Sequence, residues 1–114
     1  MHHVSPANVP EIADPRDAVV MRALVRAAEH GPDVSLTWVR LDGRHRRLRT
    51  DRSTRVYYVL DGSASFALGD DPPFEACAGD VVVVPRGVPY TFEGSMTYLV
   101  VNGPAFVDGD DIYG

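Results

Sequence analysis

Glycine and proline divide the second half of this chain into segments that are too short for stable helices. Between Gly79 and Pro85 the sequence reads Asp-Val-Val-Val-Val, so four valines lie between a turn residue and a strand breaker. β-Branched side chains favour strands, and an uninterrupted apolar run is typical of a strand buried on both faces. We therefore expect a short, fully buried strand at residues 81–84 and a fold assembled from strands of this length.

Turn signals recur at similar spacing along the rest of the chain. The expected strands are 34–41, 44–49, 55–60, 63–68, 74–78, 81–84, 90–92 and 96–101, and the expected turns include Asp42-Gly43, Asp61-Gly62, Gly79-Asp80 and Gly94-Ser95. In this scheme residues 63–68 return antiparallel to residues 55–60. Many short strands with regular turns predict an all-β fold, a double-sheet jelly roll.

The segment that follows Asp14 gives conflicting signals. Asp14 suits a helix N-cap, Pro15 suits the first helical position and Gly31 suits the residue after a last turn. Against a helix, the Val-Val-Met sequence that begins at Val19 suits a sheet, and a jelly roll needs a strand here. We expect a strand over residues 19–27, followed by a turn around Gly31.

The length of 114 residues and an apolar content of 45% are sufficient for one hydrophobic core. We expect an N-terminal extension at residues 1–18, a barrel at residues 19–107 and a solvated C-terminal tail at residues 108–114, including its three aspartates. The sequence has no apolar run of the roughly 20 residues that cross a bilayer. Residues 1–4 lack the apolar stretch of a signal peptide, so a cytoplasmic location is expected.

Charge and cysteine content narrow the expected partners. The net charge is −5, there is no lysine, and seven arginines lie within residues 40–55. The acidic excess argues against nucleic-acid binding. We expect a small-molecule substrate as the partner, and neither nucleic acid nor a membrane. The protein is expected to be a monomer or a homodimer. Cys77 is the only cysteine. It cannot form an intramolecular disulfide, and we interpret it as a small buried residue of a strand.

Two stretches resemble the signature motifs of the cupin family. Gly79 to Tyr90 follows the second motif, in which Gly, five residues, Pro-x-Gly and two residues precede a histidine, and Tyr90 stands at the histidine position. Residues 56–62 resemble the end of the first motif, which is His-x-His, three or four residues, Glu, six residues and Gly. The resemblance covers residues 19–107 and implies a cupin double-stranded β-helix, that is, a jelly-roll barrel.

The resemblance also identifies the residues at the family's metal-ligand positions. Counting back from the glycine of the first motif places Arg55 at the glutamate. The three-residue spacing places Asp51 and Arg49 at the histidines, and the four-residue spacing places Thr50 and Leu48 there. A guanidinium group has no lone pair to give and is positively charged, so it does not ligate a divalent cation. We therefore expect a barrel without a metal or other cofactor, lined by arginine and tyrosine.

The two-residue period of a strand predicts which side chains face the interior. If position 55 faces inward, the same direction is expected for Arg49, Asp51, Ser53, Arg55, Tyr57 and Val59, and on the later strand for Tyr90 and Phe92. Val56, Tyr58 and Thr91 then face outward. Trp38 and Arg40 are candidates to join the cavity from a neighbouring strand.

This set of groups supports proton transfer without a cofactor. A guanidinium lowers the pKa of a nearby phenol, so Tyr57 or Tyr90 is expected to exchange a proton with substrate. His45 is the histidine nominated as a base, and Arg55 with Tyr90 would stabilise an enolate. The expected catalytic residues are thus Tyr57, His45, Tyr90 and Arg55. The expected substrate-binding residues are Arg49, Asp51, Arg40, Trp38, Arg44 and Phe92.

Among cupins, the chain resembles the metal-independent uridine-aldehyde dehydratase of uridyl-peptide antibiotic biosynthesis. The matching segments are residues 53–59, Gly62, residues 80–85, residues 94–96 and residues 104–106. A functional tyrosine of that enzyme maps onto Tyr57. Its functional histidine maps onto Arg44, with His45 one residue later. A shift of one residue turns a side chain to the opposite face unless a bulge restores it, so the base position stays open.

Several interpretations therefore remain. The first is a metal-independent lyase, such as a dehydratase, or an isomerase of specialised metabolism, acting next to a carbonyl of an anionic, nucleoside or sugar-like substrate. The second is a non-catalytic module that binds a carboxylate or phosphate ligand. A distant third is a metal-dependent cupin that uses Asp51, His45 and Tyr90. Two further interpretations give these residues a structural role only. In one, Arg55 forms a buried ion pair with Asp51. In the other, Tyr57 and Tyr90 are core aromatics whose hydroxyls form hydrogen bonds with the backbone.

Overall fold

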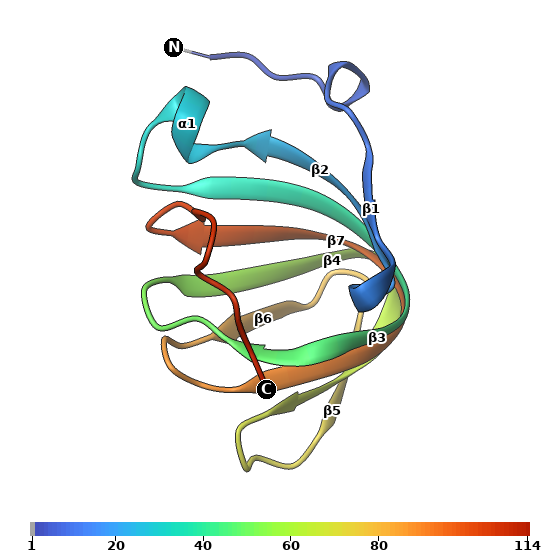
Figure 1. Ribbon diagram of the computed structural model, residues 1–114. Coiled ribbons are helices and arrows are strands. Elements are labelled where there is room, and N and C mark those ends of the chain that lie inside the picture. The colour runs from blue at the N-terminus through green and yellow to red at the C-terminus, as the bar shows by residue number, and fades with distance from the viewer. Residues whose placement is uncertain (1) are drawn as a thin grey trace.

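Three long strands organise the fold, and each of them runs through both layers of the barrel. They are β3 (Ser35–Arg49), β4 (Thr54–Leu68) and β7 (Tyr90–Gly103). In the computed structural model, which describes residues 2–114, these strands bend together at one end of the molecule and leave the other end open (Figure 1). The all-β jelly-roll architecture expected from the turn spacing is confirmed.

The shorter strands complete the two layers. The first layer contains β1 (Ile12–Asp14), β2 (Val19–Val25) and β6 (Val81–Val84). β2 pairs with the first half of β3, β6 pairs with the first half of β4, and β1 extends the sheet by pairing with β2. The second contains β5 (Phe74–Cys77) and β8 (Ile112–Tyr113), which pair with the second half of β4 and β3. In both layers β7 lies between β3 and β4. All of these pairs are antiparallel, so each layer can present alternate side chains to the interior.

The expected turns at Asp42-Gly43, Asp61-Gly62 and Gly94-Ser95 are wrong, because the chain bends there without leaving the strand. Gly62 has φ +78°, and a Cβ at this position would collide with the backbone of Ser95. A Cβ at Gly94 would collide with the backbone of Ser63 and Ala64. Glycine marks these positions because adjacent strands approach closely at the bend, and not because the chain reverses. Residues 63–68 therefore continue β4 and do not return along it.

The strand expected after Asp14 is confirmed, although the helix signals also have local effects. The carboxylate of Asp14 accepts a hydrogen bond from the backbone N–H of Arg16 and caps a single 3-10 turn, η2 (Pro15–Asp17). Strand β2 follows and pairs with β3, and the short α1 (Ala27–His30) precedes Gly31. Pairing within the sheet thus overrides the local helix signals over most of this segment.

The valine strand β6 is buried on one face only, which corrects the expectation of burial on both. Val82 and Val84 lie in the core, whereas Val81 and Val83 are 55% and 54% exposed. The reason is that β6 has the barrel interior on one side and no further layer of residues 2–114 on the other. Cys77 on β5 is likewise exposed, and it is Ala76 that is buried there.

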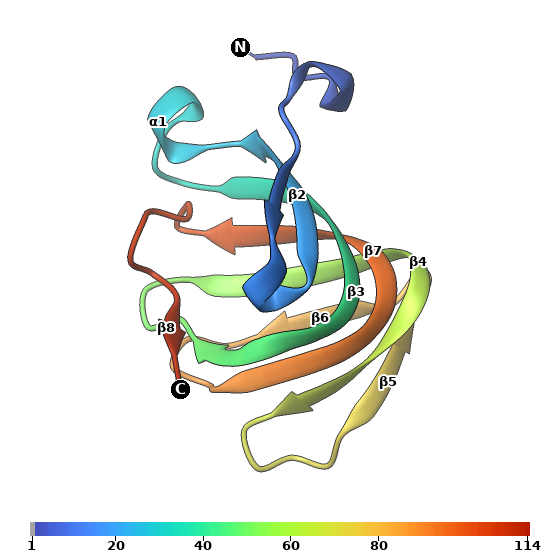
Figure 2. The same cartoon turned by 45° about the vertical axis from the view of Figure 1, so that its right-hand side comes forward.

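The C-terminal segment is part of the barrel and not a solvated tail. It runs from the end of β7 across the open end and reaches the second layer, where β8 pairs with Leu48 and Arg49 of β3 (Figures 1 and 2). The carboxylates of Asp110 and Asp111 each pair with an arginine, Arg52 and Arg55, at 2.7 Å. These contacts cover the open end. No helix within residues 2–114 is long and apolar enough to span a membrane.

Candidate active site

A hydrogen-bonded chain of three side chains crosses the interior near the open end. Tyr57 extends from β4 in the first layer and Tyr90 from β7 in the second, and their hydroxyl oxygens lie 2.6 Å apart. Nη1 of Arg55 donates to the Tyr90 hydroxyl at 3.0 Å. Tyr57, Tyr90 and Arg55 are 3%, 0% and 4% exposed. Their hydroxyls meet each other and a guanidinium, not the backbone as one interpretation expected.

Arg55 is held by partners on two sides. Its Nε donates to Oδ1 of Asn102, and its Nη2 donates to Asp111 at 2.7 Å. The structural interpretation was therefore correct that Arg55 forms an ion pair, but its partner is Asp111 and not Asp51. Burial opposes the charged form of Arg55, yet interactions with Tyr57, Tyr90 and Asp111 outweigh it and raise its pKa. Arg55 is accordingly a permanent cation and hydrogen-bond donor inside the barrel.

Both phenols of the chain are neutral over the physiological range. Burial raises the pKa of Tyr57 well above its ordinary value, and the lowering effect of Arg55 is smaller. Burial likewise raises the pKa of Tyr90, against the opposing effects of Arg55 and Tyr57. The expectation that the guanidinium makes a phenol acidic is therefore wrong in its net direction. Neutral hydroxyls can still donate hydrogen bonds to a developing negative charge.

Aromatic rings fill the interior around this chain. The ring of Tyr57 lies 5.3 Å from the rings of Phe92 and Tyr98, and 5.7 Å from that of Phe66. Phe92 stacks on Phe66 at 4.8 Å and lies 6.1 Å from Tyr90. Such packing fixes the ring positions and hence the direction of the hydroxyl groups.

His45 faces the same interior by the regular alternation of β3, which pairs with β7 without a break from Ser35 to His45 and buries Val39 and Leu41 on that face. The register places His45 opposite Phe92 and Leu48 opposite Tyr90, with one extra residue in β3 between these pairs. The bulge follows His45 and brings Leu48 to the interior face as well. The imidazole of His45 stacks on Phe92 at 4.7 Å, one aromatic ring away from Tyr57. Between the two alternatives for the histidine position, His45 faces inward and Arg44 is exposed.

The imidazole is oriented by its Nδ1 atom. Nδ1 lies 2.9 Å from the carbonyl oxygen of Arg46 and 3.7 Å from the carboxylate of Asp17. A carbonyl only accepts, so the proton of the neutral ring sits on Nδ1 and the lone pair on Nε2. Asp17 is buried and also accepts from the backbone and guanidinium of Arg46. Burial alone would raise its pKa, but the hydrogen bonds of Arg46 and the nearby His45 lower it.

The metal-ligand positions of the cupin family can now be assigned. Leu48 and Thr50 are buried at 1% exposure each, whereas Arg49 and Asp51 pair at the surface, 44% and 55% exposed. In the first motif, the four-residue spacing therefore matches the positions that face the interior. The expected inward direction of Arg49 and Asp51 is wrong. The interior positions hold Leu48, Thr50, Arg55 and Tyr90.

This set does not fit a divalent metal. Leu48 has no donor atom, Arg55 is a cation, and only neutral hydroxyls remain. Within residues 2–114 there is no group of three or more His, Cys, Asp or Glu side chains placed to hold an ion. The atypical ligand set is not assembled either, because Asp51 lies at the surface while His45 and Tyr90 line the interior. The Thr50 hydroxyl is buried without a hydrogen-bond partner in the described chain.

Other residues named from the sequence lie outside the barrel. Trp38 and Arg40 alternate with the buried Val39, so they point away from the interior. The guanidinium carbon of Arg22 lies 5.7 Å from the centre of the Trp38 ring instead. Phe92, by contrast, is fully inside.

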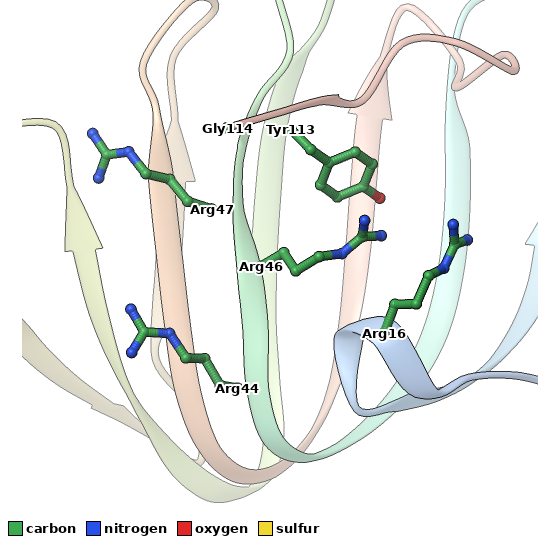
Figure 3. Close-up of a pocket in the computed structure, with 6 residues that line it drawn as sticks. All are labelled: Arg16, Arg44, Arg46, Arg47, Tyr113 and Gly114. Atoms are coloured by element: carbon green, nitrogen blue, oxygen red, sulfur yellow. The ribbon is translucent and has the colours of Figure 1, made fainter.

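Neither of two surface hollows is lined by the Arg55, Tyr90 and Tyr57 chain. One of about 520 Å³ is lined mainly by arginines (Figure 3), and one of about 170 Å³ lies beside Arg44 and Pro73. The interior hydroxyls are thus enclosed by aromatic side chains and by the C-terminal segment, in place of the open cavity that the sequence led us to expect.

Sequence reasoning missed three partners of the interior groups: Asp17, Asn102 and Asp111. Each lies far along the chain from its partner; Asp111 is 56 positions from Arg55 and Asp17 is 29 from Arg46. The only local signal for Asp111 was a group of aspartates, which is usually solvated.

Comparisons with known proteins identify solved structures with a similar fold. Neither a protein-family model nor a curated protein matches the sequence. The solved structure of Pac13, described as a unique nucleoside dehydratase, has a TM-score of 0.86 at 20% identity over 100% of this chain and 91% of its own. Streptomyces Pac13 variants with uridine superpose equally well.

Two other structures are also similar. KdgF from Halomonas sp. has a TM-score of 0.82 at 15% identity over 95% of this chain and 97% of its own. Oxalate decarboxylase from Bacillus subtilis has a TM-score of 0.82 at 17% identity over 99% of this chain and 32% of its own. The chain therefore has a cupin-like fold that resembles Pac13.

Proposed function

We propose that this chain is a metal-independent lyase or isomerase that removes a proton next to a carbonyl group. The observation that carries the proposal is the chain of buried donors from Arg55 through Tyr90 to Tyr57, on the same interior face as an oriented His45. Loss of a proton next to a carbonyl needs a base for the proton and donors for the resulting enolate oxygen. The barrel supplies both without a cofactor.

The donor side is the hydroxyl pair. Arg55 donates to the oxygen of Tyr90, so the Tyr90 proton is free for Tyr57, and the Tyr57 proton is then free for an enolate oxygen. Because both phenols are neutral, neither acts as a base: Tyr57 donates to the oxyanion, and Tyr90 donates to Tyr57. Asp111 balances the charge of Arg55, so the Arg55 guanidinium orients the hydroxyls and does not by itself demand an anionic substrate.

The base is His45. Its Nε2 carries the lone pair when Nδ1 donates to the Arg46 carbonyl, and the Asp17 carboxylate, 3.7 Å from Nδ1, stabilises the imidazolium formed on proton uptake. In a dehydration, the C–H bond next to the carbonyl breaks and its proton passes to Nε2. The C–O bond of a β-hydroxyl then breaks, and the hydroxyl leaves as water after taking that proton. Reprotonation of the carbon instead gives isomerisation.

The substrate must reach hydroxyls that are buried. Tyr57 is 3% exposed, so catalysis requires a movement, and we assign it to residues 104–111, which cross the open end and hold Arg55 through Asp111. The unpartnered Thr50 hydroxyl then offers a hydrogen bond to a polar substrate group. The structural similarity to a nucleoside dehydratase supports a nucleoside-like or sugar-like carbonyl compound with a β-hydroxyl, in specialised metabolism.

A proton-exchange experiment tests this function. Uridine 5′-aldehyde has a C–H next to its carbonyl and a hydroxyl on the following carbon, and NMR in D2O detects both deuterium entry and loss of that hydroxyl. The wild-type protein should catalyse at least one of these reactions. Tyr57→Phe and His45→Gln should each lower the rate by about a hundredfold or more. Absence of exchange and of dehydration, with this substrate and with simple β-hydroxy aldehydes, would refute the proposal.

The alternative function is a non-catalytic binding module. The observation in its favour is that the donor chain of Arg55, Tyr90 and Tyr57 can hold a ligand oxygen without any proton transfer. Saturable binding of uridine without proton exchange, unaffected by His45→Gln, would support this alternative, because a binder does not need a base.

A further inference from the structure

A groove of about 520 Å³ lies along the outer side of β3, away from the interior hydroxyls. It is lined by Arg16, Arg44, Arg46, Arg47, Tyr113 and Gly114. Figure 3 shows Arg44 and Arg47 extending to one side of β3, and Arg46 extending to the other side below Tyr113, towards Arg16 of η2. The proposed proton transfer does not use Arg16, Arg44 or Arg47, and it uses the Arg46 side chain only as the partner of Asp17.

The bulge that follows His45 helps to create the groove. A regular strand would place alternate residues outside, whereas the extra residue between His45 and Leu48 leaves Arg46 and Arg47 both off the interior face. Arg44 precedes them on the same outer face. Three guanidinium groups therefore gather on one short stretch of β3.

The positive charge of the groove is only partly balanced. Arg16 pairs with Asp14 and Arg46 pairs with Asp17. Arg44 and Arg47 have no carboxylate within ion-pair distance in residues 2–114. The net charge of the whole chain is −5, so this is a local positive site on an acidic protein. A small anion can use such a site, whereas a long polyanion would meet the surrounding negative charge.

One of the four guanidiniums is held rigidly. Arg46 lies 3.8 Å from the centre of the Tyr113 ring and donates to Asp17 through Nε and Nη2. The Tyr113 hydroxyl in turn lies 3.3 Å from Asp17. An arginine fixed in this way loses little side-chain entropy when it meets a ligand.

We propose that this groove binds a small polyanion that carries a diphosphate group. Guanidinium forks match the paired oxygens of phosphate, and two of the forks here lack a carboxylate partner in the described chain. The volume is in the range of small-molecule sites and is too large for a single ion. The two arginines without a carboxylate partner, Arg44 and Arg47, take no part in the proposed proton transfer, and the Arg46 side chain links the groove to that site only through Asp17.

Calorimetric titration with inorganic pyrophosphate at low salt tests this site. We expect saturable binding with a Kd on the order of 100 μM, weakened by added salt. The double variant Arg44→Ala and Arg47→Ala should weaken binding by at least about tenfold. Both side chains are exposed, so the melting temperature should not change. The matched control is Arg40→Ala, which removes an exposed arginine from the outer face of the other layer and should leave the Kd unchanged.

Several results would overturn the proposal. Equal weakening by Arg40→Ala would mean that the response follows net charge and not the groove. Binding of citrate without pyrophosphate would identify a carboxylate site, and binding of an oligonucleotide without pyrophosphate would identify a nucleic-acid surface. Absence of pyrophosphate binding at millimolar concentration would exclude a diphosphate site.

Discussion

The hydroxyl oxygens of Tyr57 and Tyr90 lie 2.6 Å apart inside the barrel, although the residues are 33 positions apart and belong to opposite layers. This hydrogen bond joins the two sheets near the open end, where Arg55 and the C-terminal segment meet. The same contact thus contributes to stability and orients the donors that we assign to catalysis.

Tyr57→Phe should separate these two contributions. Loss of one buried hydroxyl should lower the free energy of unfolding by only about 1 kcal/mol, whereas turnover should fall by about a hundredfold or more. Tyr98→Phe is the matched control, since Tyr98 is buried beside Tyr57 but lies outside the donor chain. Urea denaturation and the proton-exchange assay measure the two effects. Equal turnover in the two variants would remove Tyr57 from the mechanism.

The ion pair between Arg55 and Asp111 should be strongly coupled. Arg55→Met leaves the Asp111 carboxylate and the Tyr90 hydroxyl without their donor, so we expect a loss of about 3 kcal/mol in unfolding free energy. Asp111→Asn should also destabilise, and the double variant should lose less than the sum of the single losses. Arg52→Met is the control, because Arg52 is 42% exposed and its ion pair with Asp110 should matter less. Additive losses in urea denaturation would show that the pair is not coupled.

Thr50→Val should stabilise the protein. The Thr50 hydroxyl is buried without a partner in residues 2–114, and valine has the same shape without the desolvation cost, so the gain should be about 1 kcal/mol. Ser53→Ala is the comparison, since the Ser53 hydroxyl donates to the Pro104 carbonyl at 2.8 Å and its loss should destabilise. Thermal melts measure both effects. The substrate KM should rise in Thr50→Val if this hydroxyl binds substrate, and destabilisation would show that it has a partner.

Asp17 should make the protein acid-sensitive. Hydrogen bonds from Arg46 outweigh burial and lower the pKa of Asp17 in the folded state. Such a carboxyl stabilises the fold at pH values above its unfolded pKa of about 4, and this contribution is lost as the pH falls through the lower folded value. Urea denaturation should therefore show a smaller loss of stability between about pH 5 and pH 2 in Asp17→Asn than in wild type.

The control for this titration is Asp61→Asn, which removes an exposed carboxylate without an ion pair in residues 2–114 and should retain the wild-type slope. Identical slopes for wild type and Asp17→Asn would contradict the assignment.

Gly62→Ala should be more damaging than Gly79→Ala. Both glycines have positive φ, +78° and +91°, so alanine costs about 1 kcal/mol or more at either position. At Gly62 the added Cβ also collides with the backbone of Ser95, whereas the space around Gly79 is open. The difference in melting temperature between the two variants measures the close approach of β4 and β7 at the bend. Equal melting temperatures would show that the bend can relax.

Local sequence signals determined the fold class and much of the interior alternation. The period of two correctly placed Ser53, Arg55, Tyr57 and Val59 inside, because that alternation follows from strand geometry alone. The same signals could not distinguish a turn from a bend. Glycine with positive φ serves both, and only the neighbouring strands at Gly62 and Gly94 decide that the chain continues.

The inward direction of Leu48 and Thr50 and the neutralisation of Arg55 depend on tertiary structure. A bulge changes the face of every residue beyond it, and whether one forms depends on the register with β7, which the sequence of β3 does not contain. The partner of Arg55 lies 56 residues away, and it reaches the guanidinium because the C-terminal segment crosses the open end. Residue types thus determined what chemistry was available, and long-range packing decided which groups meet, because contact between distant residues depends on the path of the whole chain.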